Sequence, residues 1–177
     1  DGQVTFSQAI SGTSADFDGG VTIDNITIDG TEIDLSSGDL TIDVAGDITV
    51  DAGQTIDASG NGGVGNLTFT AGRSVLINES ITLKGSFTAS ANQNIGAANF
   101  TNTQREDGAA VITVADGKTI DTSASNANIV LEVGVGAGNA VLTSGDISVE
   151  GLNAGSGDIS IVNQGITNGS GIIATSA

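Results

Sequence analysis

The chain has no Pro, Cys, Met, Trp, Tyr or His among its 177 residues, and its only aromatic residues are five Phe. Without Cys or His, the common nucleophile–base pairs of enzymes cannot be built, and zinc loses its usual ligands. A pair of Asp side chains acting on a glycosidic bond would lack the Trp or Tyr ring on which a sugar stacks. We therefore expect a protein that is not an enzyme and that requires no cofactor.

Positive charge and long apolar runs are also scarce. Four Lys and Arg residues stand against 21 Asp and Glu residues, which gives a formal net charge of −17. Such a surface repels nucleic acid and anionic membranes, and no run of about eighteen apolar residues is present. We expect neither a nucleic-acid partner nor membrane insertion, whereas divalent cations or a cationic partner would suit this charge.

What the chain does contain is a short apolar–polar–apolar triplet, repeated between turns rich in Gly, Asp, Asn and Ser. Alternation at period two predicts a strand of about three residues for each triplet, with its outer side chains on one face. Strands this short become stable when the chain winds so that each lies on the equivalent strand of the previous turn. The clearest triplets begin at Val21, Ile26, Ile33, Leu40, Ile48, Leu67, Ile81, Ile112, Ile147 and Ile159.

This pattern predicts an all-β fold, a right-handed single-chain parallel β-helix, or β-solenoid. The spacing of the first triplets predicts about eight or nine coils of roughly twenty residues each. Residues 1–20 are expected to form an initial coil or linker and residues 21–177 the β-solenoid. The pattern weakens between Gly85 and Gly108, where Gln104-Arg105-Glu106-Asp107 is the most polar point, so we expect a protruding loop at 85–110.

Two internal repeats support the winding. Residues 48–59 recur as 112–123 with eight of twelve positions identical, an offset of 64 residues that we interpret as about three coils. Residues 144–148 recur as 156–160, a shorter step that indicates two faces of one coil.

Two stretches of the chain resemble the repeats of known groups of proteins. Residues 53–63, followed by 67–75, resemble the repeat region of filamentous-haemagglutinin-type bacterial adhesins, and the likeness extends in style over residues 45–177. It implies a right-handed parallel β-helix that extends from the cell surface. The Asn-Pro-Asn-Gly-type motif of that family's secretion domain is absent. Residues 21–50 also resemble repeats of phage tail fibres and other virion structural proteins, which keeps a virion origin open.

Carboxylates carry most of the chemistry in the chain. Equivalent outward positions of a solenoid stack about 4.8 Å apart, so like charges there repel and a cation between rungs would relieve them. Calcium, which takes carboxylate and carbonyl oxygens, is the ion that fits such turns. The alternative is that these side chains are solvated and keep the rod soluble. The predicted metal ligands are Asp24, Asp29, Asp34, Asp43, Asp47 and Asp51.

Five Asn-x-Ser/Thr sequons are possible glycosylation sites in a secreted rod. They are Asn25, Asn66, Asn78, Asn99 and Asn168. Outward Thr residues, among them Thr41, Thr68 and Thr88, would form a hydroxyl ladder of the type used by ice-binding solenoids, or they reflect the high β-propensity of Thr.

We therefore expect a non-catalytic structural or adhesive rod, secreted or at the cell surface. It would be a segment or subunit of a surface fibre that stacks end to end, with a host-surface or glycan receptor as a further partner. A phage tail-fibre or other virion segment is the alternative, and an ice-binding solenoid is the third.

Overall fold

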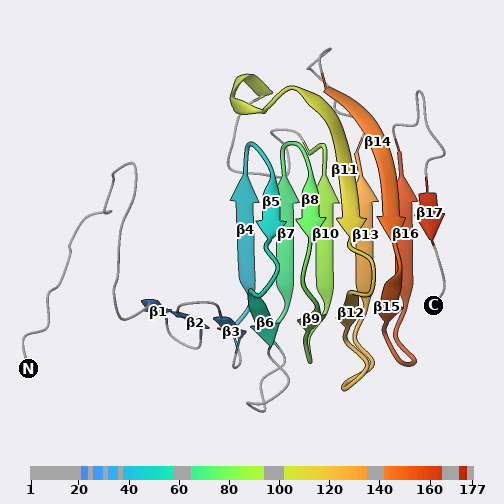
Figure 1. Ribbon diagram of the computed structural model, residues 1–177. Helices are drawn as coiled ribbons and strands as arrows, with labels where there is room; N and C mark the ends of the chain where they lie inside the picture. Colours follow the sequence, from blue (N-terminus) through green and yellow to red (C-terminus); the bar gives the residue numbers. More distant parts are fainter. Residues whose placement is uncertain are drawn as a thin grey trace, which may run out of the picture.

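The computed structural model describes residues 21–23, 26–29, 32–35, 38–57, 65–93, 102–134, 142–164 and 172–174. Apart from one 3-10 turn, η1 (Asn102–Gln104), its regular elements are strands in three sheets (Figure 1). Sheet A holds β1 (Val21–Ile23), β2 (Ile26–Asp29), β3 (Glu32–Leu35), β6 (Thr55–Asp57), β9 (Ile81–Thr82), β12 (Thr119–Asp121) and β15 (Gly151–Asn153). Sheet B holds β4 (Leu40–Val44), β7 (Leu67–Ala71), β10 (Phe87–Ala91), β13 (Ile129–Val133) and β16 (Ile159–Asn163). Sheet C holds β5 (Ile48–Val50), β8 (Val75–Ile77), β11 (Gly108–Val114), β14 (Leu142–Val149) and β17 (Ile172–Ala174).

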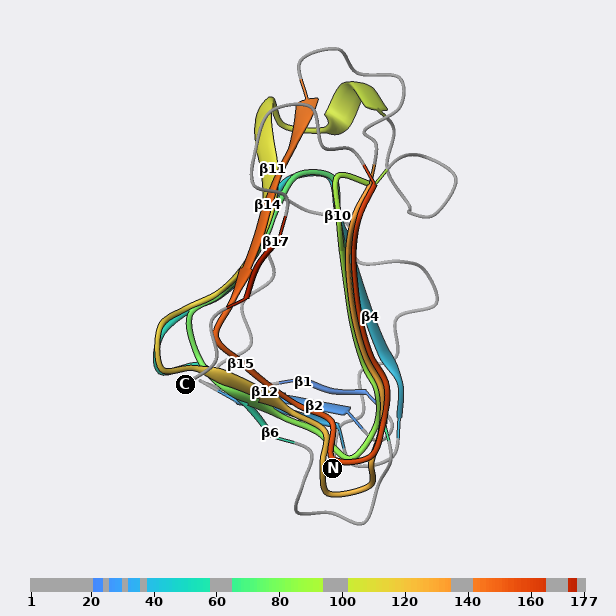
Figure 2. The same ribbon diagram turned by 90° about the vertical axis from the view of Figure 1, so that its right-hand side faces the viewer.

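The chain passes through sheets A, B and C in turn, so that each turn adds one strand to every sheet. From β3 onward all neighbouring strands within a sheet are parallel. Figure 2 looks along the stack and shows the three sheets as the sides of a triangle. We number the turns as rungs 1 to 5, from β3–β4–β5 to β15–β16–β17. The prediction of an all-β parallel solenoid is confirmed at this level, and its right-handed sense stays a prediction.

The core is a set of apolar columns that run along the inside of the triangle. In sheet B, Leu40, Leu67, Phe87, Ile129 and Ile159 form one column of register partners. Period-two alternation turns the first, third and fifth residues of each such strand inward, so Phe87, Ala89 and Ala91 of β10 are fully buried. The rings of Phe69 and Phe87 pack edge to face across two rungs, with centroids 5.6 Å apart.

The coils do not have a constant length of about twenty residues. Register partners along the sheet B column are 27, 20, 42 and 30 residues apart, from Leu40 to Ile159. The described strands form five rungs, because the turns between strands differ greatly in length. The repeated segments 48–59 and 112–123 do return to the same faces, but after two turns: Ile48 pairs with Val75, which pairs with Ile112.

The first triplets depart from the predicted parallel winding. β1 pairs with β2, and β2 with β3, in antiparallel register within sheet A. Asp29 lies opposite Glu32, so only two residues connect β2 and β3. Asp-Gly is a dipeptide that favours such two-residue hairpin connections, and Asp29-Gly30 stands at this point of the sequence. A spacing of seven or eight residues therefore does not by itself distinguish a coil from a hairpin.

Of two further predicted segments, the structure describes one in part and the other not at all. Residues 1–20, predicted as an initial coil, lie outside the described residues. Within the predicted loop at 85–110, residues 87–91 form β10 inside the core, 94–101 lie outside the described residues, and β11 begins at Gly108. The connection between β10 and β11 therefore begins and ends inside the range predicted for the loop.

Candidate functional site

The corner between sheets B and C carries the longest connection between described strands, residues 92–107, and long connections in three successive rungs. The first two B-to-C connections are tight, at 45–47 and 72–74. The next three are longer, at 92–107, 134–141 and 164–171, and parts of each lie outside the described residues. In repeat proteins, insertions on one face often form the binding face. We therefore take this B–C corner as the candidate functional site.

The excursion of rung 3 folds back over rungs 1 and 2. Figure 2 shows η1 beyond the top of the triangle, above the B–C corner. The backbone N–H of Glu106 donates to the carbonyl oxygen of Ala45 over 3.4 Å. A Cβ on Gly46 would lie 2.7 Å from Glu106 Oε1, so the absence of a side chain at Gly46 leaves room for this approach. Residues 102–107, which we call the strap, thus lie across the corner.

Arg73 ties three rungs together at this corner. Its Nε and Nη2 atoms donate to the two carboxylate oxygens of Asp47 over 2.7 and 2.6 Å, a bidentate pair. Nη2 also lies 2.7 Å from Glu106 Oε2, and Nη1 donates to the carbonyl oxygen of Asp107 over 3.1 Å. The hydrogen bond from Arg73 lowers the pKa of Asp47, and that bond raises the pKa of Arg73.

Arg105 forms a buried polar node beneath the strap. It is 5% exposed, its Nε donates to the carbonyl oxygen of Gly72 over 3.1 Å, and its Nη2 donates to Asn92 Oδ1. Asn92, with a φ of 55°, uses its Nδ2 to donate to the carbonyl oxygen of Gly134 and to Ser144 Oγ over 2.9 and 3.0 Å. Burial lowers the pKa of Arg105. The node joins the edges of the excursions that leave from rungs 3 and 4.

Both arginines of the chain therefore lie at one corner of a strongly acidic molecule. The sequence pattern placed Arg105 in the most polar part of an expected protruding loop, but its side chain is buried. The guanidinium of Arg105 is held against the rod by its hydrogen bond to the backbone carbonyl oxygen of Gly72. Asn92 was missed, since one Asn within a polar stretch gives no periodic signal.

The predicted metal ligands that the structure describes lie on several different elements. Asp24 lies outside the described residues, Asp29 and Asp34 lie on β2 and β3, and Asp43 lies on β4. Asp47 binds the guanidinium of Arg73 and also accepts the backbone N–H of Ser74 over 2.9 Å. The positive charge beside Asp47 is therefore that of Arg73, where a metal ion was predicted. Asp51 follows β5 and is exposed. Among the described residues no group of three or more His, Cys, Asp or Glu side chains could hold a metal ion.

The predicted sequons have different outcomes. Asn25, Asn99 and Asn168 lie outside the described residues. Asn66 uses its side chain to bind neighbouring rungs: its Nδ2 donates to Asp39 Oδ1 over 3.0 Å, and its Oδ1 accepts the N–H of Ser86 over 2.8 Å. A glycan on Asn66 would break this contact. Asn78 is half-buried, and its backbone N–H donates to the carbonyl oxygen of Val50 over 2.8 Å.

Asn66 belongs to a polar ladder that runs along the whole A–B corner. The residue before each sheet B strand offers a side-chain oxygen, which accepts the backbone N–H of the equivalent residue one rung on, over 2.8 to 3.3 Å. The members of this A–B ladder are Asp39, Asn66, Ser86, Asn128 and Asp158. A signal for it exists in the sequence, because each member precedes the first apolar residue of a strand.

A second ionic clamp lies at the C–A corner. Lys118 Nζ of rung 4 lies 2.6 Å from Glu79 Oε1, and Glu79 also accepts backbone N–H groups of Gly53 and Ser80, each over 3.0 Å. These bonds, that of Lys118 first, lower the pKa of Glu79 to about 2. Charged groups at both corners therefore connect neighbouring turns.

The outward Thr residues stack only in part. Thr41, Thr68 and Thr88 are register partners on sheet B, and the column continues with Val130 and Ser160. The adjacent outward column contains Asp43 and Glu132 beside Thr70 and Ser90. Carboxylates within the array interrupt the regular hydroxyl lattice that an ice-binding face would need.

Comparisons with protein-family models, curated proteins and solved structures give no match to this chain. Within the part that the structure describes, no helix is long and apolar enough to cross a membrane. Function must therefore be argued from the geometry of the rod and its corners.

Proposed function

We propose that this chain is a non-catalytic extracellular rod, a segment or subunit of a surface fibre, which presents the excursions of its B–C corner to a partner. The observation that supports the proposal is the combination of a continuous core with longer connections at one corner of three successive rungs. Backbone hydrogen bonds along the stack make the frame stiff, and Arg73 and Arg105 fix the base of the excursions. A host-surface protein or a glycan is the partner class that we propose.

Repetition of one corner also suits multivalent contact. Several weak contacts on one stiff body raise the overall affinity without any single tight site. Calcium remains a proposal for carboxylates at the ends of the rod or outside the described residues, and not for the clamped Asp47.

The proposal can be tested by trimming the corner. In one variant, residues 135–141 are replaced by a tight connection such as that at 72–74. In the matched control, the excursion 58–64 at the A–B corner is shortened in the same way. Labelled full chain and both variants are applied to cultured cells and to a glycan array, with and without a calcium chelator, after circular dichroism has verified their β content.

We expect the full chain and the A–B control to bind and the B–C variant to lose most of its binding. Equal binding by all three proteins, or no binding by the full chain, would contradict the proposal. Loss of binding on chelation would assign a ligand role to carboxylates, whereas unchanged binding would leave them as solvated groups.

A further inference from the structure

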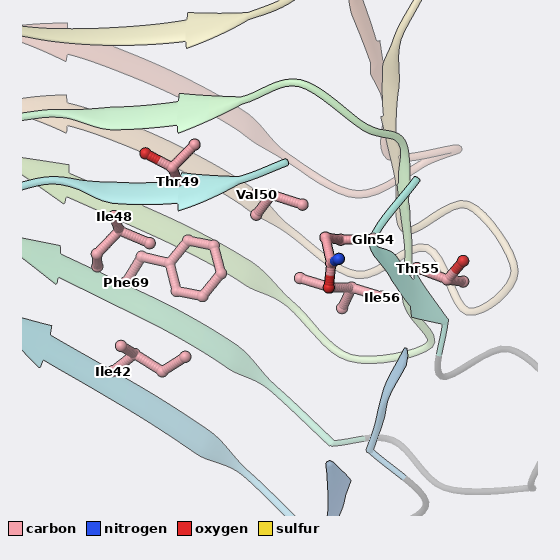
Figure 3. A pocket seen from close by; sticks show the side chains of 8 residues that line it. All are labelled: Ile42, Ile48, Thr49, Val50, Gln54, Thr55, Ile56 and Phe69. Atoms are coloured by element: carbon pink, nitrogen blue, oxygen red, sulfur yellow. The ribbon is translucent and has the colours of Figure 1, made fainter. Parts of the chain in front are cut away.

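The apolar core is packed less completely at both ends of the described stack than in its middle. At the rung 1 end, a cavity of about 100 Å³ is bounded by Ile42, Ile48, Val50, Ile56 and Phe69. Figure 3 shows these side chains pointing toward one another, while Thr49 and Thr55 point away. At the other end Ile159 is 46% exposed, although its column partners Ile129 and Phe87 are fully buried. Each end could therefore accept further apolar contacts, at the cavity on one side and at Ile159 on the other.

The three sheets contain the same number of parallel strands. Without β1 and β2, sheet A contains β3, β6, β9, β12 and β15, so each of the three sheets contributes five parallel strands. A second copy placed on the rung 5 end would bring three pairs of edges together at once. Its β3 would lie beside β15, its β4 beside β16 and its β5 beside β17, without a gap or an overlap in any sheet.

The register of the columns continues across this junction. The sheet A column Ile33, Ile56, Ile81, Ile120 and Leu152 would meet Ile33 of the next copy. In sheet B, Ile159 and Ile161 would lie beside Leu40 and Ile42 of the next copy, which adds apolar neighbours to the exposed Ile159 and to the rim of the cavity. In the A–B ladder, Asp158 would accept the N–H of Asp39, as Asn128 accepts that of Asp158.

The strands β1 and β2 obstruct this contact. β2 pairs with the edge of β3 on the side where β15 of the preceding copy would lie, and β1 adds one more strand. Both would overlap sheet A of that copy. Because β2 runs antiparallel, it ends the parallel series while it satisfies the hydrogen-bonding groups of the β3 edge.

We propose that β1 and β2 cap the rod against head-to-tail stacking, and that the partner of the uncapped end is a second copy of this chain. The biological role of this device rests on the proposed fibre function. Removal of the cap exposes β3, and a head-to-tail contact of this kind does not close, so it produces filaments. Five rungs at about 4.8 Å predict an axial repeat of about 24 Å per copy.

The charge of Asp158 should weaken the contact between two stacked copies. Asp158 and Asp39 would be ladder neighbours in the stack, and two carboxylates on adjacent rungs repel each other. Inside the rod, Asn occupies two of the ladder positions, at Asn66 and Asn128. Asp158→Asn should therefore favour stacking, with a critical concentration that is lower by about threefold to tenfold at low salt.

The experiment compares the full chain with a chain that lacks residues 1–31. Sedimentation velocity and negative-stain electron microscopy report assembly, and far-ultraviolet circular dichroism reports the fold. Ile159→Lys in the shortened chain is the control, because it places a charge at the junction on a side chain that is already exposed. Thr27→Pro in the full chain is a second way to disrupt β2 and decides the question if the shortened chain does not fold.

We expect the full chain to be monomeric, the shortened chain to lose its monomer peak and form filaments, and Ile159→Lys to restore the monomer. Thr27→Pro should also form filaments. Monomeric behaviour of both uncapped proteins with native dichroism would overturn the proposal, and so would equal polymerisation of the full chain. Binding to cells and glycans is measured on the full chain. If the full chain does not bind, that result counts against the proposed function and leaves the cap proposal standing.

Discussion

Asn92 offers the sharpest test of the buried node at the B–C corner. Asn92 and Asn126 are the two residues other than Gly with positive φ in the described part of the chain, at 55° and 56°. Asn92 is 1% exposed and binds three partners, whereas Asn126 is exposed and its Oδ1 accepts the N–H of Ser156 over 2.9 Å. The two sites share a backbone conformation and differ in burial, so each serves as a control for the other.

The expected cost follows from the bonds that are lost. Asn92→Gly keeps the backbone conformation but removes an acceptor from the buried Arg105 and a donor from Ser144 and Gly134. Unsatisfied buried groups cost about 1 to 3 kcal/mol each, and Ser144 still donates to Gly134, so we expect a loss of about 2 to 4 kcal/mol. Asn92→Ala should cost about 1 kcal/mol more, because Ala is strained in the left-handed region.

Asn126→Gly should cost about 1 kcal/mol or less, because water replaces its bonds. Urea unfolding followed by far-ultraviolet circular dichroism measures all three variants, as the chain has no Trp or Tyr to report by fluorescence. If Asn92→Gly were no more destabilising than Asn126→Gly, the reasoning on the buried node would be refuted.

Further variants test the corners. The pKa of Glu79 is about 2 in the folded chain against an ordinary 4.5, so its bonds stabilise the fold above pH 4.5 and this stability is lost as the pH falls toward 2. Melting curves of Glu79→Gln should therefore depend less on pH in this range than those of the parent chain, and parallel curves would refute the clamp. Gly72→Ala places a Cβ 2.1 Å from the backbone carbonyl oxygen of Ala45 and should lower the melting temperature clearly. In the Gly46→Ala variant, the new Cβ meets only the movable side chain of Glu106, so the melting temperature should fall little. The reverse order of the two melting temperatures would contradict this packing. Ser86→Ala should cost about 1 kcal/mol in urea unfolding, because it removes the acceptor of the Asn128 N–H, and Ser86→Asn should restore it; equal stability of all three proteins would count against the A–B ladder.

Much of the strand pattern could be predicted from the sequence. The triplets at Leu40, Ile48, Leu67 and Ile112 form strands. The first and third residues of each triplet face the core, because alternation at period two fixes which side chains share a face. The repeat of 48–59 at 112–123 returns to the same two sheets for the same reason.

Coil length could not be predicted, because the turns do not contribute to the periodic signal. A connection of three residues and one of sixteen, as at 45–47 and 92–107, leave the strands of sheets B and C in the same register. Likewise the antiparallel pairing of β1 and β2 depends on two-residue connections, which the triplet pattern does not distinguish from solenoid corners.

The candidate site was the least predictable part. The acidic residues were predicted either to bind a metal cation or to be solvated, but Asp47 binds Arg73, which lies 26 residues away in the chain and on the next rung in space. Likewise Arg105 finds its partners on rungs that only the fold brings together, at Gly72 and Asn92.

The measurement that tests the account most directly is disulfide formation between rungs, in a chain that has no Cys of its own. Thr88 and Val130 are register partners on sheet B although 42 residues separate them, so their Cα atoms lie within the range of about 4.4 to 6.8 Å that a disulfide requires. We predict that a Thr88→Cys, Val130→Cys chain closes an intramolecular disulfide on mild oxidation, visible by mass and on non-reducing gels. The control, Thr88→Cys with Ala109→Cys, has the spacing of a coil of constant length and should remain reduced, because Ala109 lies in sheet C. A disulfide in the control and none in the first chain would contradict the five-rung solenoid.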